Sequence, residues 1–280
     1  MKHETGKFQG ARGAEIFWQS WLPEGEPKAV LLVVHGLGEH SGRYMNLVNH
    51  VLPLGYAVYG LDHFGHGNSE GTRVFVERFA DFTDTLKMYF DQIHAAQPGK
   101  PIFLVGHSLG GLIGCAYLLD HQHELAGSII SAPGIKVSDS ISQATILASK
   151  LFSRLAPKMG IAALDSAAIC SDPAVVQAYL DDPLVYNGKV TARLAAESLG
   201  AMQRVTHEVG TIHLPLLVVQ GTADRLVDPG GATMLYEQSA SADKTLKTYD
   251  GFYHEVMNEP GRDQVFADIE AWLEARVSAT

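Results

Sequence analysis

The sequence lacks the features that would place a protein in a membrane or on nucleic acid. It has two cysteines in 280 residues, too few for a disulfide framework, which indicates a reducing compartment. No run of about 18 apolar residues occurs, so no membrane-spanning helix is expected. Residues 1–7 have no apolar stretch behind them, which predicts no signal peptide. The formal net charge of −10 argues against a nucleic-acid partner and against a broadly basic membrane-docking surface, and we expect a cytoplasmic protein.

The sequence does contain short apolar runs that alternate with helical patterns. Hydrophobic residues make up 46% and charged residues 19%, as in an ordinary globular domain. Strands are predicted at 29–35, 56–62, 101–106, 128–131, 215–220 and 245–249, with an edge hairpin around 15–21. Helices are predicted near 43–53, 79–96, 109–121, 230–239 and 261–276. This alternation predicts an α/β fold whose mostly parallel, eight-stranded sheet has helices on both faces.

The interval from about 131 to 215 shows no convincing strand. Because a compact domain rarely holds so long a structureless segment, we expect a helical cap at 134–209 inserted into a core of 1–133 and 210–280. A helix is expected at 141–156, ended by Pro157. It carries a basic stripe beside leucines: Lys150, Arg154 and Lys158 with Leu147, Leu151 and Leu155. The stripe fits a lid in transient contact with membranes or micelles, which would make the protein peripheral to a membrane, or a cap helix with a solvated basic edge.

The segment GHSLGG at 106–111 carries the strongest chemical signal. It contains G-x-S-x-G directly after a predicted strand and before a predicted helix, the context in which a serine nucleophile sits on a sharp turn. Glycines two residues to either side let strand and helix pass closely. Ser108 is therefore the candidate nucleophile, although a glycine-rich turn with an incidental serine would look similar.

A serine nucleophile needs a base and an acid, which follow it in this fold in the order acid, then histidine. Asp224 lies just after the strand at 215–220, with Asp228 and Asp250 as rivals. His254 follows the last predicted strand, whereas His207 and His213 precede Asp224 and break the order.

The backbone N–H groups of Leu109 and Leu37 are the expected oxyanion hole, because one follows the nucleophile and the other lies in an early loop after a strand. Asp62, His63 and His66 could in principle bind a metal. No helical H-E-x-x-H and no paired CxxC motif is present, and neither is a dinucleotide loop or a P-loop. We therefore expect no metal and no cofactor.

Several segments resemble the monoacylglycerol lipases of the α/β-hydrolase fold. These segments are 35–44 (HGLGEHSGRY), 62–71 (DHFGHGNSEG), 106–111, 179–184 (YLDDPL) and 221–226 (GTADRL). The serine motif is shared by the whole superfamily, whereas the segment at 35–44 is far more specific. The resemblance runs from about residue 14 to the C-terminus. At Val227 the sequence departs from the mammalian members, which carry a cysteine near the site, so thiol reagents are expected to act weakly.

The resemblance implies a lipase that acts without a cofactor and cleaves monoacylglycerols to fatty acid and glycerol through a Ser108–His254–Asp224 acyl-enzyme mechanism. The partners would be a small lipid ester and water. The resemblance also assigns Glu39, Arg43 and Tyr179 to the glycerol end of the pocket. For Glu39 and Arg43, a structural ion pair that fixes the oxyanion loop, residues 35–39, is an equal alternative.

Other functions remain open. A general carboxylesterase or lysophospholipase would use the same triad on another alcohol. A peptidase of this fold would need an acidic pocket for a free amine, and Glu39 could supply it. A catalytically inactive binding protein usually loses triad members, whereas this sequence keeps them all.

Overall fold

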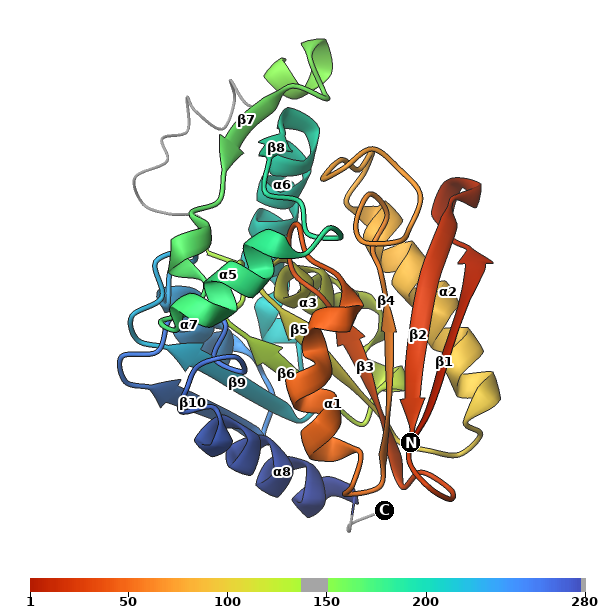
Figure 1. The fold of residues 1–280 in the computed structure, drawn as a ribbon. Coiled ribbons are helices and arrows are strands. Elements are labelled where there is room, and N and C mark those ends of the chain that lie inside the picture. Colours follow the sequence, from red (N-terminus) through yellow and green to blue (C-terminus); the bar gives the residue numbers. More distant parts are fainter. Residues whose placement is uncertain (137–150, 278–280) are drawn as a thin grey trace.

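A central eight-stranded sheet is covered by helices on both faces in the computed structural model, which describes residues 1–136 and 151–277 (Figure 1). The strands are β1 (Lys2–Gln9), β2 (Glu15–Leu22), β3 (Ala29–Val34), β4 (Tyr56–Leu61), β5 (Ile102–His107), β6 (Gly127–Ser131), β9 (Leu216–Gly221) and β10 (Lys244–Tyr249). Their order is β1-β2-β4-β3-β5-β6-β9-β10. β1 and β2 form the expected antiparallel edge hairpin, and the strands from β4 to β10 run parallel to one another.

The inner strands are mostly apolar because both of their faces are buried. In β3, Val30, Leu32 and Val34 point into one core and Leu31 and Val33 into the other. The first core is covered by α2 (Ala80–Ala96), α3 (Leu109–His121), α6 (Ala192–Glu208) and α7 (Gly230–Gln238). The second is covered by α1 (Met45–Val51) and α8 (Asp263–Val277). The predicted fold class is confirmed.

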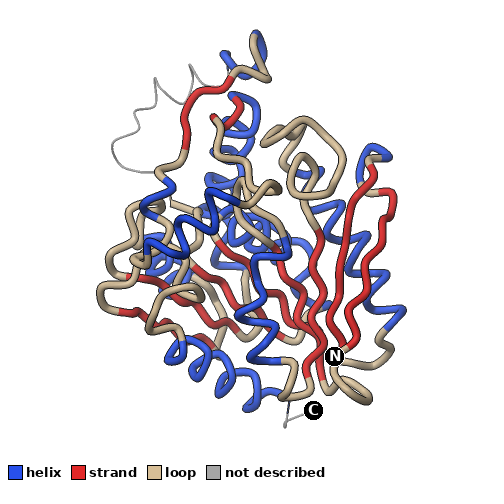
Figure 2. Tube along the Cα trace, viewed as in Figure 1, coloured by secondary structure: helices blue, strands red, loops and turns tan. Residues whose placement is uncertain are grey.

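The described part of the segment between β6 and β9 lies outside the sheet, mostly at the end of the molecule opposite both termini (Figures 1 and 2). Its described part contains a helical stretch at 151–155, then β7 (Gly160–Ala163), α5 (Pro173–Asp181), β8 (Lys189–Thr191) and α6. The expectation of no strand here was wrong, because β7 and β8 pair as a short antiparallel ribbon. β7 has four residues, all exposed, so it shows no alternation of buried and exposed positions. The limits of the cap stay a prediction.

Part of the predicted cap helix, including Leu147 and Lys150, lies outside the described residues. Among the helices that the structure describes, none is long and apolar enough to cross a bilayer.

Candidate active site

Ser108 occupies a tight turn between β5 and α3. Its backbone has φ 55° and ψ −116°, and its N–H donates to the carbonyl of Ser131 at 3.0 Å. The flanking glycines are required by close packing. A Cβ at Gly106 would lie 2.6 Å from the carbonyl oxygen of Gly110, and a Cβ at Gly110 only 2.0 Å from that of Val34. This turn presents the serine at the carboxyl edge of the sheet, next to the N-terminus of α3.

Asp224 and His254 come together from the loops that follow β9 and β10. His254 Nδ1 lies 2.8 Å from Asp224 Oδ2, and both side chains are almost fully buried. Asp224 also accepts hydrogen bonds from Gln220 Nε2 at 2.9 Å and from the N–H groups of Leu226 at 2.8 Å and Val227 at 3.2 Å. Burial alone would raise the pKa of Asp224, but the hydrogen bond with His254 and these backbone donors lower it.

The two rival acids are engaged elsewhere. Asp228 forms an ion pair with Lys136 at 2.8 Å and accepts from the N–H of Gly230. Asp250 accepts from the hydroxyl of Thr222 at 3.1 Å. Of the three candidate acids, Asp224 is therefore the one that contacts His254.

Ser108 and His254 line the same cavity, whose volume is about 430 Å³. Gly36, Leu37 and Leu109 line it beside Ser108. Most of the remaining wall is apolar and comes from the insertion and from α3: Leu112, Ile161, Leu164, Ile169, Val190, Leu194, Ala195, Leu199 and Met202, with Leu226 and Val227 from the Asp224 loop. Such a wall suits a long hydrocarbon group.

The polar residues of the wall include Glu39, Tyr179 and Glu255. Glu39 accepts from the N–H of Gly36 at 2.6 Å, from the Tyr44 hydroxyl at 2.9 Å and from Arg43 at 2.7 Å. Burial would raise the pKa of Glu39, but Arg43 and nearby histidines outweigh it and lower that pKa to about 2.

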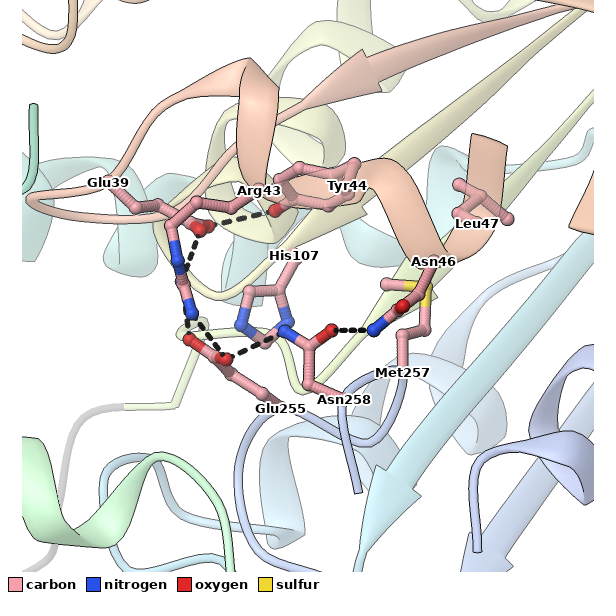
Figure 3. A pocket seen from close by; sticks show the side chains of 9 residues that line it. All are labelled: Glu39, Arg43, Tyr44, Asn46, Leu47, His107, Glu255, Met257 and Asn258. Atoms are coloured by element: carbon pink, nitrogen blue, oxygen red, sulfur yellow. Dashed lines mark hydrogen bonds and ion pairs between the residues drawn. The ribbon is translucent and has the colours of Figure 1, made fainter. Parts of the chain in front are cut away.

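Arg43 lies behind Glu39 and Glu255 and lines a neighbouring cavity of about 20 Å³ (Figure 3). Its guanidinium donates to Glu39 and, as a two-pronged fork, to Glu255 at 2.7 and 2.8 Å. The ring of Tyr179 packs over it, 4.6 Å from ring centre to guanidinium carbon. Glu39 and Arg43 thus form an ion pair beside the oxyanion loop, and Glu39 also lines the cavity. The two expected roles, a structural ion pair and a contact with glycerol, do not exclude each other. Glu255 had not been predicted, although it directly follows His254.

His63 and His66, which were considered as metal ligands, pack against the ring of His35. The ring centres of His35 and His63 are 4.2 Å apart, and those of His35 and His66 are 5.4 Å apart. Burial lowers the pKa of all three, that of His66 to about 3. In the part of the chain that the structure describes, no three potential metal ligands converge.

Comparison with known proteins decides the family. The sequence model described as serine aminopeptidase S33, a hydrolase family, matches residues 25–261. The chain belongs to this family. This S33-family hydrolase is 35% identical to the monoacylglycerol lipase of Mycolicibacterium smegmatis, over 95% of each chain. It is 36% identical to the mouse monoglyceride lipase, over 96% of this chain and 90% of the mouse protein.

Its fold also matches solved structures. The crystal structure of the Paleococcus ferrophilus monoacylglycerol lipase superposes over the full length of both chains with a TM-score of 0.82 and 29% identity. The resemblance to monoacylglycerol lipases, the α/β-hydrolase fold and the enzyme class of carboxylic ester hydrolase are confirmed.

Proposed function

We propose that this hydrolase cleaves monoacylglycerols to fatty acid and glycerol, with Ser108 as nucleophile, His254 as base and Asp224 as acid. The observation that carries the proposal is the single cavity shared by Ser108 and His254, with an apolar wall for an acyl chain and buried carboxylates at its polar part. A cavity of about 430 Å³ holds one acyl chain more readily than three. The names of the relatives point the same way.

In the proposed reaction, Ser108 Oγ attacks the ester carbonyl while His254 Nε2 takes the hydroxyl proton. Asp224 holds the other ring nitrogen, so that Nδ1 keeps its proton and the imidazolium is stabilised. The N–H groups of Leu37 and Leu109 stabilise the oxyanion. The His254 proton passes to the departing glycerol oxygen as the carbon–oxygen bond breaks. A water molecule, deprotonated by His254, then attacks the acyl-enzyme and releases the fatty acid.

The polar part of the cavity is proposed to select the glycerol group. Glu39 and Tyr179 line the cavity, and a carboxylate and a phenol hydroxyl can form hydrogen bonds with two alcohol groups. Arg43 would act here through Glu39, whose carboxylate it orients. A site with buried polar groups rejects substrates that leave them unpaired, and this discriminates against esters without a polyol.

Covalent labelling tests the nucleophile. An alkyl fluorophosphonate should add once, and the modified peptide should contain Ser108. Ser108→Ala should abolish labelling and lower turnover by about a millionfold. A modified peptide that lacks Ser108 would refute the assignment.

A set of substrates with one acyl chain tests the head group. We expect the 1-monoacylglycerol to be cleaved faster than the methyl ester, the lysophospholipid and a proline amide. Glu39→Gln should lower the rate of cleavage of the 1-monoacylglycerol by a larger factor than the rate of cleavage of the methyl ester. Equal rates on all esters would make the protein a general carboxylesterase, and a preferred amide would make it a peptidase.

A transient contact with lipid surfaces is proposed for the insertion. The exposed large apolar side chains of its described part are Leu151, Phe152, Leu155, Met159, Ile161, Leu164 and Leu180. Phe152→Asp with Leu155→Asp should weaken co-sedimentation with monoacylglycerol-containing vesicles, because charge opposes insertion of this surface. Met88→Asp, at an exposed methionine on α2, is the matched control. Equal binding by all three proteins would contradict the contact.

A further inference from the structure

The loop that carries His254 consists of turns and bends between β10 and α8, so its position depends on contacts with other parts of the chain. Asp224 holds only one edge of the imidazole ring. The backbone on either side of His254 is held by further hydrogen bonds. Glu259 accepts from the N–H groups of Tyr253 and Ser171, both at 2.9 Å, and the N–H of Glu255 donates to the carbonyl of Ile169 at 2.7 Å.

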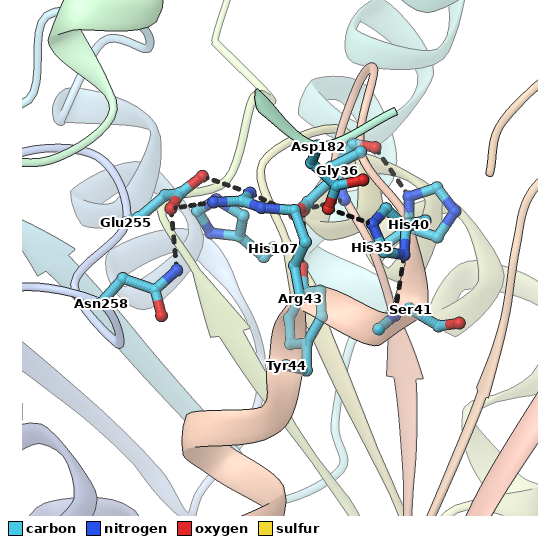
Figure 4. Close-up of polar contacts among 12 residues, drawn as sticks. His35, Gly36, His40, Ser41, Arg43, Tyr44, His107, Asp182, Glu255 and Asn258 are labelled. Carbon is cyan, nitrogen blue, oxygen red and sulfur yellow. Dashed lines mark hydrogen bonds and ion pairs between the residues drawn. The ribbon is translucent and has the colours of Figure 1, made fainter. Parts of the chain in front are cut away.

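The side chain of Glu255 connects this loop to the opposite side of the site (Figure 4). Both of its oxygens accept from Arg43, and the same guanidinium donates to Glu39 at 2.7 Å. Glu39 in turn accepts from the N–H of Gly36. Gly36 lies against the nucleophile, since a Cβ there would be 3.2 Å from the Cβ of Ser108. An unbroken chain of charged contacts thus runs from the residue beside His254 to the oxyanion loop.

The backbone that carries Arg43 is held in a fixed position relative to the sheet. Arg43 lies on the short 3-10 helix η2 (Ser41–Tyr44), and that helix is tied to the end of β4. The N–H and hydroxyl of Ser41 both donate to Asp62 Oδ1, at 2.9 and 2.6 Å. Forked arginine–carboxylate contacts fix direction as well as distance. The sheet can therefore set the position of the His254 loop through Arg43.

The same acids separate two cavities. Glu39, His107 and Glu255 line both the cavity of about 430 Å³ and the one of about 20 Å³ behind it. The side chains of Glu255 and Arg43 are only 6% and 10% exposed, so water screens their contact weakly. Two carboxylates share one guanidinium here, which leaves the group with a net charge of −1.

We propose that Glu255 is a positioning residue for ester hydrolysis: through Arg43 it holds the His254 loop in register with the oxyanion loop and Ser108. The inference rests on the proposed roles of Ser108 and His254 but not on the identity of the alcohol. Misplacement of a catalytic group by about 1 Å can cost a hundredfold in rate. Loss of the fork should therefore slow attack on any ester, whether or not glycerol is the leaving group.

Two variants break the fork without leaving a buried charge unpaired. Glu255→Gln keeps the shape of the side chain and leaves Arg43 paired with Glu39. Arg43→Lys keeps the charge but cannot donate to both acids in a fixed geometry. Asp81→Asn is the matched control, since the Asp81 side chain is also 6% exposed and contacts Arg12 and Arg78 away from the cavity.

The rate of acylation is measured with a p-nitrophenyl ester, which lacks glycerol. The values of kcat and KM are measured with a 1-monoacylglycerol. We expect Glu255→Gln and Arg43→Lys to lower acylation and kcat by about 10- to 100-fold on both substrates, with KM changed by less than about threefold. Asp81→Asn should match the parent protein. Melting temperatures of all variants accompany the rates.

Normal acylation by the p-nitrophenyl ester, with a raised KM for monoacylglycerol alone, would overturn the inference and make Glu255 a glycerol contact. An equal loss in Asp81→Asn would overturn it as well, because general destabilisation would then explain the rates. If the variants lose activity on both substrates but the parent protein shows no preference for monoacylglycerol, the proposed substrate fails and the positioning role stands.

Discussion

Replacing Asp224 by asparagine should remove catalysis while leaving the fold intact. The aspartate accepts from four donors, one of which is His254 Nδ1. In the proposed mechanism this contact keeps the proton of His254 on Nδ1 and leaves Nε2 free to accept from Ser108. An amide oxygen can still accept from the N–H groups of Leu226 and Val227. Its NH₂ group would then face His254 and favour the proton on Nε2, where the ring cannot act as a base.

Because of Gln220, the Asp224→Asn substitution should lower the free energy of unfolding only slightly. Gln220 Nε2 donates to Asp224, while Gln220 Oε1 is buried without a hydrogen-bond partner. A flip of the Gln220 amide would direct Oε1 to the introduced NH₂ group and avoid a clash of donors, at the cost of the hydrogen bond from Nε2 to the carbonyl of Gly221. By analogy with other triads, kcat should fall about 10⁴-fold, which corresponds to ~5 kcal/mol of transition-state stabilisation.

The assay is steady-state hydrolysis of a p-nitrophenyl ester, with the melting temperature measured on the same samples. Asp228→Asn is the control, because Asp228 lies four residues further on and pairs with Lys136. It should keep nearly full activity. A loss of less than tenfold in Asp224→Asn, or an equal loss in Asp228→Asn, would refute the assignment of the acid.

Three further predictions concern packing, pH and chain length. Gly110→Ala should prevent folding or activity, because the new Cβ would meet the carbonyl oxygen of Val34 at 2.0 Å, and soluble protein with normal circular dichroism and activity would contradict this. The pKa of His66 is about 3 in the fold and 6.5 when unfolded, so stability should be full above pH 6.5 and fall as the unfolded chain takes up protons below it. Between pH 6.5 and 5, the free energy of unfolding measured by urea denaturation should fall by about 2 kcal/mol less in His66→Gln than in the parent protein. Equal decreases in the two proteins would count against a neutral buried His66. Ala195→Trp should shift the preference toward shorter acyl chains by filling the cavity wall, whereas an unchanged chain-length profile would place the acyl chain elsewhere.

The sheet and the nucleophile turn could be predicted because their signals are local. Buried parallel strands require continuous apolar runs, and 29–34 and 216–219 are such runs. The G-x-S-x-G pattern reflects contacts among residues within one turn and the neighbouring strand. The order of acid and histidine along the chain then left few candidates, and the structure brings Asp224 and His254 into contact.

The ribbon of β7 and β8 could not be predicted, because its strands have only four and three residues and are far apart in sequence. Glu255 was missed for a related reason. Its partner Arg43 is 212 residues away, and an acid beside a histidine forms no recognisable motif. Only the folded chain shows that the residue next to His254 is attached to the oxyanion loop.

The most direct test of the account is the rate of hydrolysis of mono-, di- and triacylglycerols of one chain length, with Ser108→Ala as the blank. We expect the monoacylglycerol to be cleaved at least tenfold faster than the diacylglycerol and the triacylglycerol to be cleaved scarcely at all, because one apolar cavity and a polar wall for free hydroxyls face Ser108. Equal rates on all three, or activity that persists in the blank, would contradict the account.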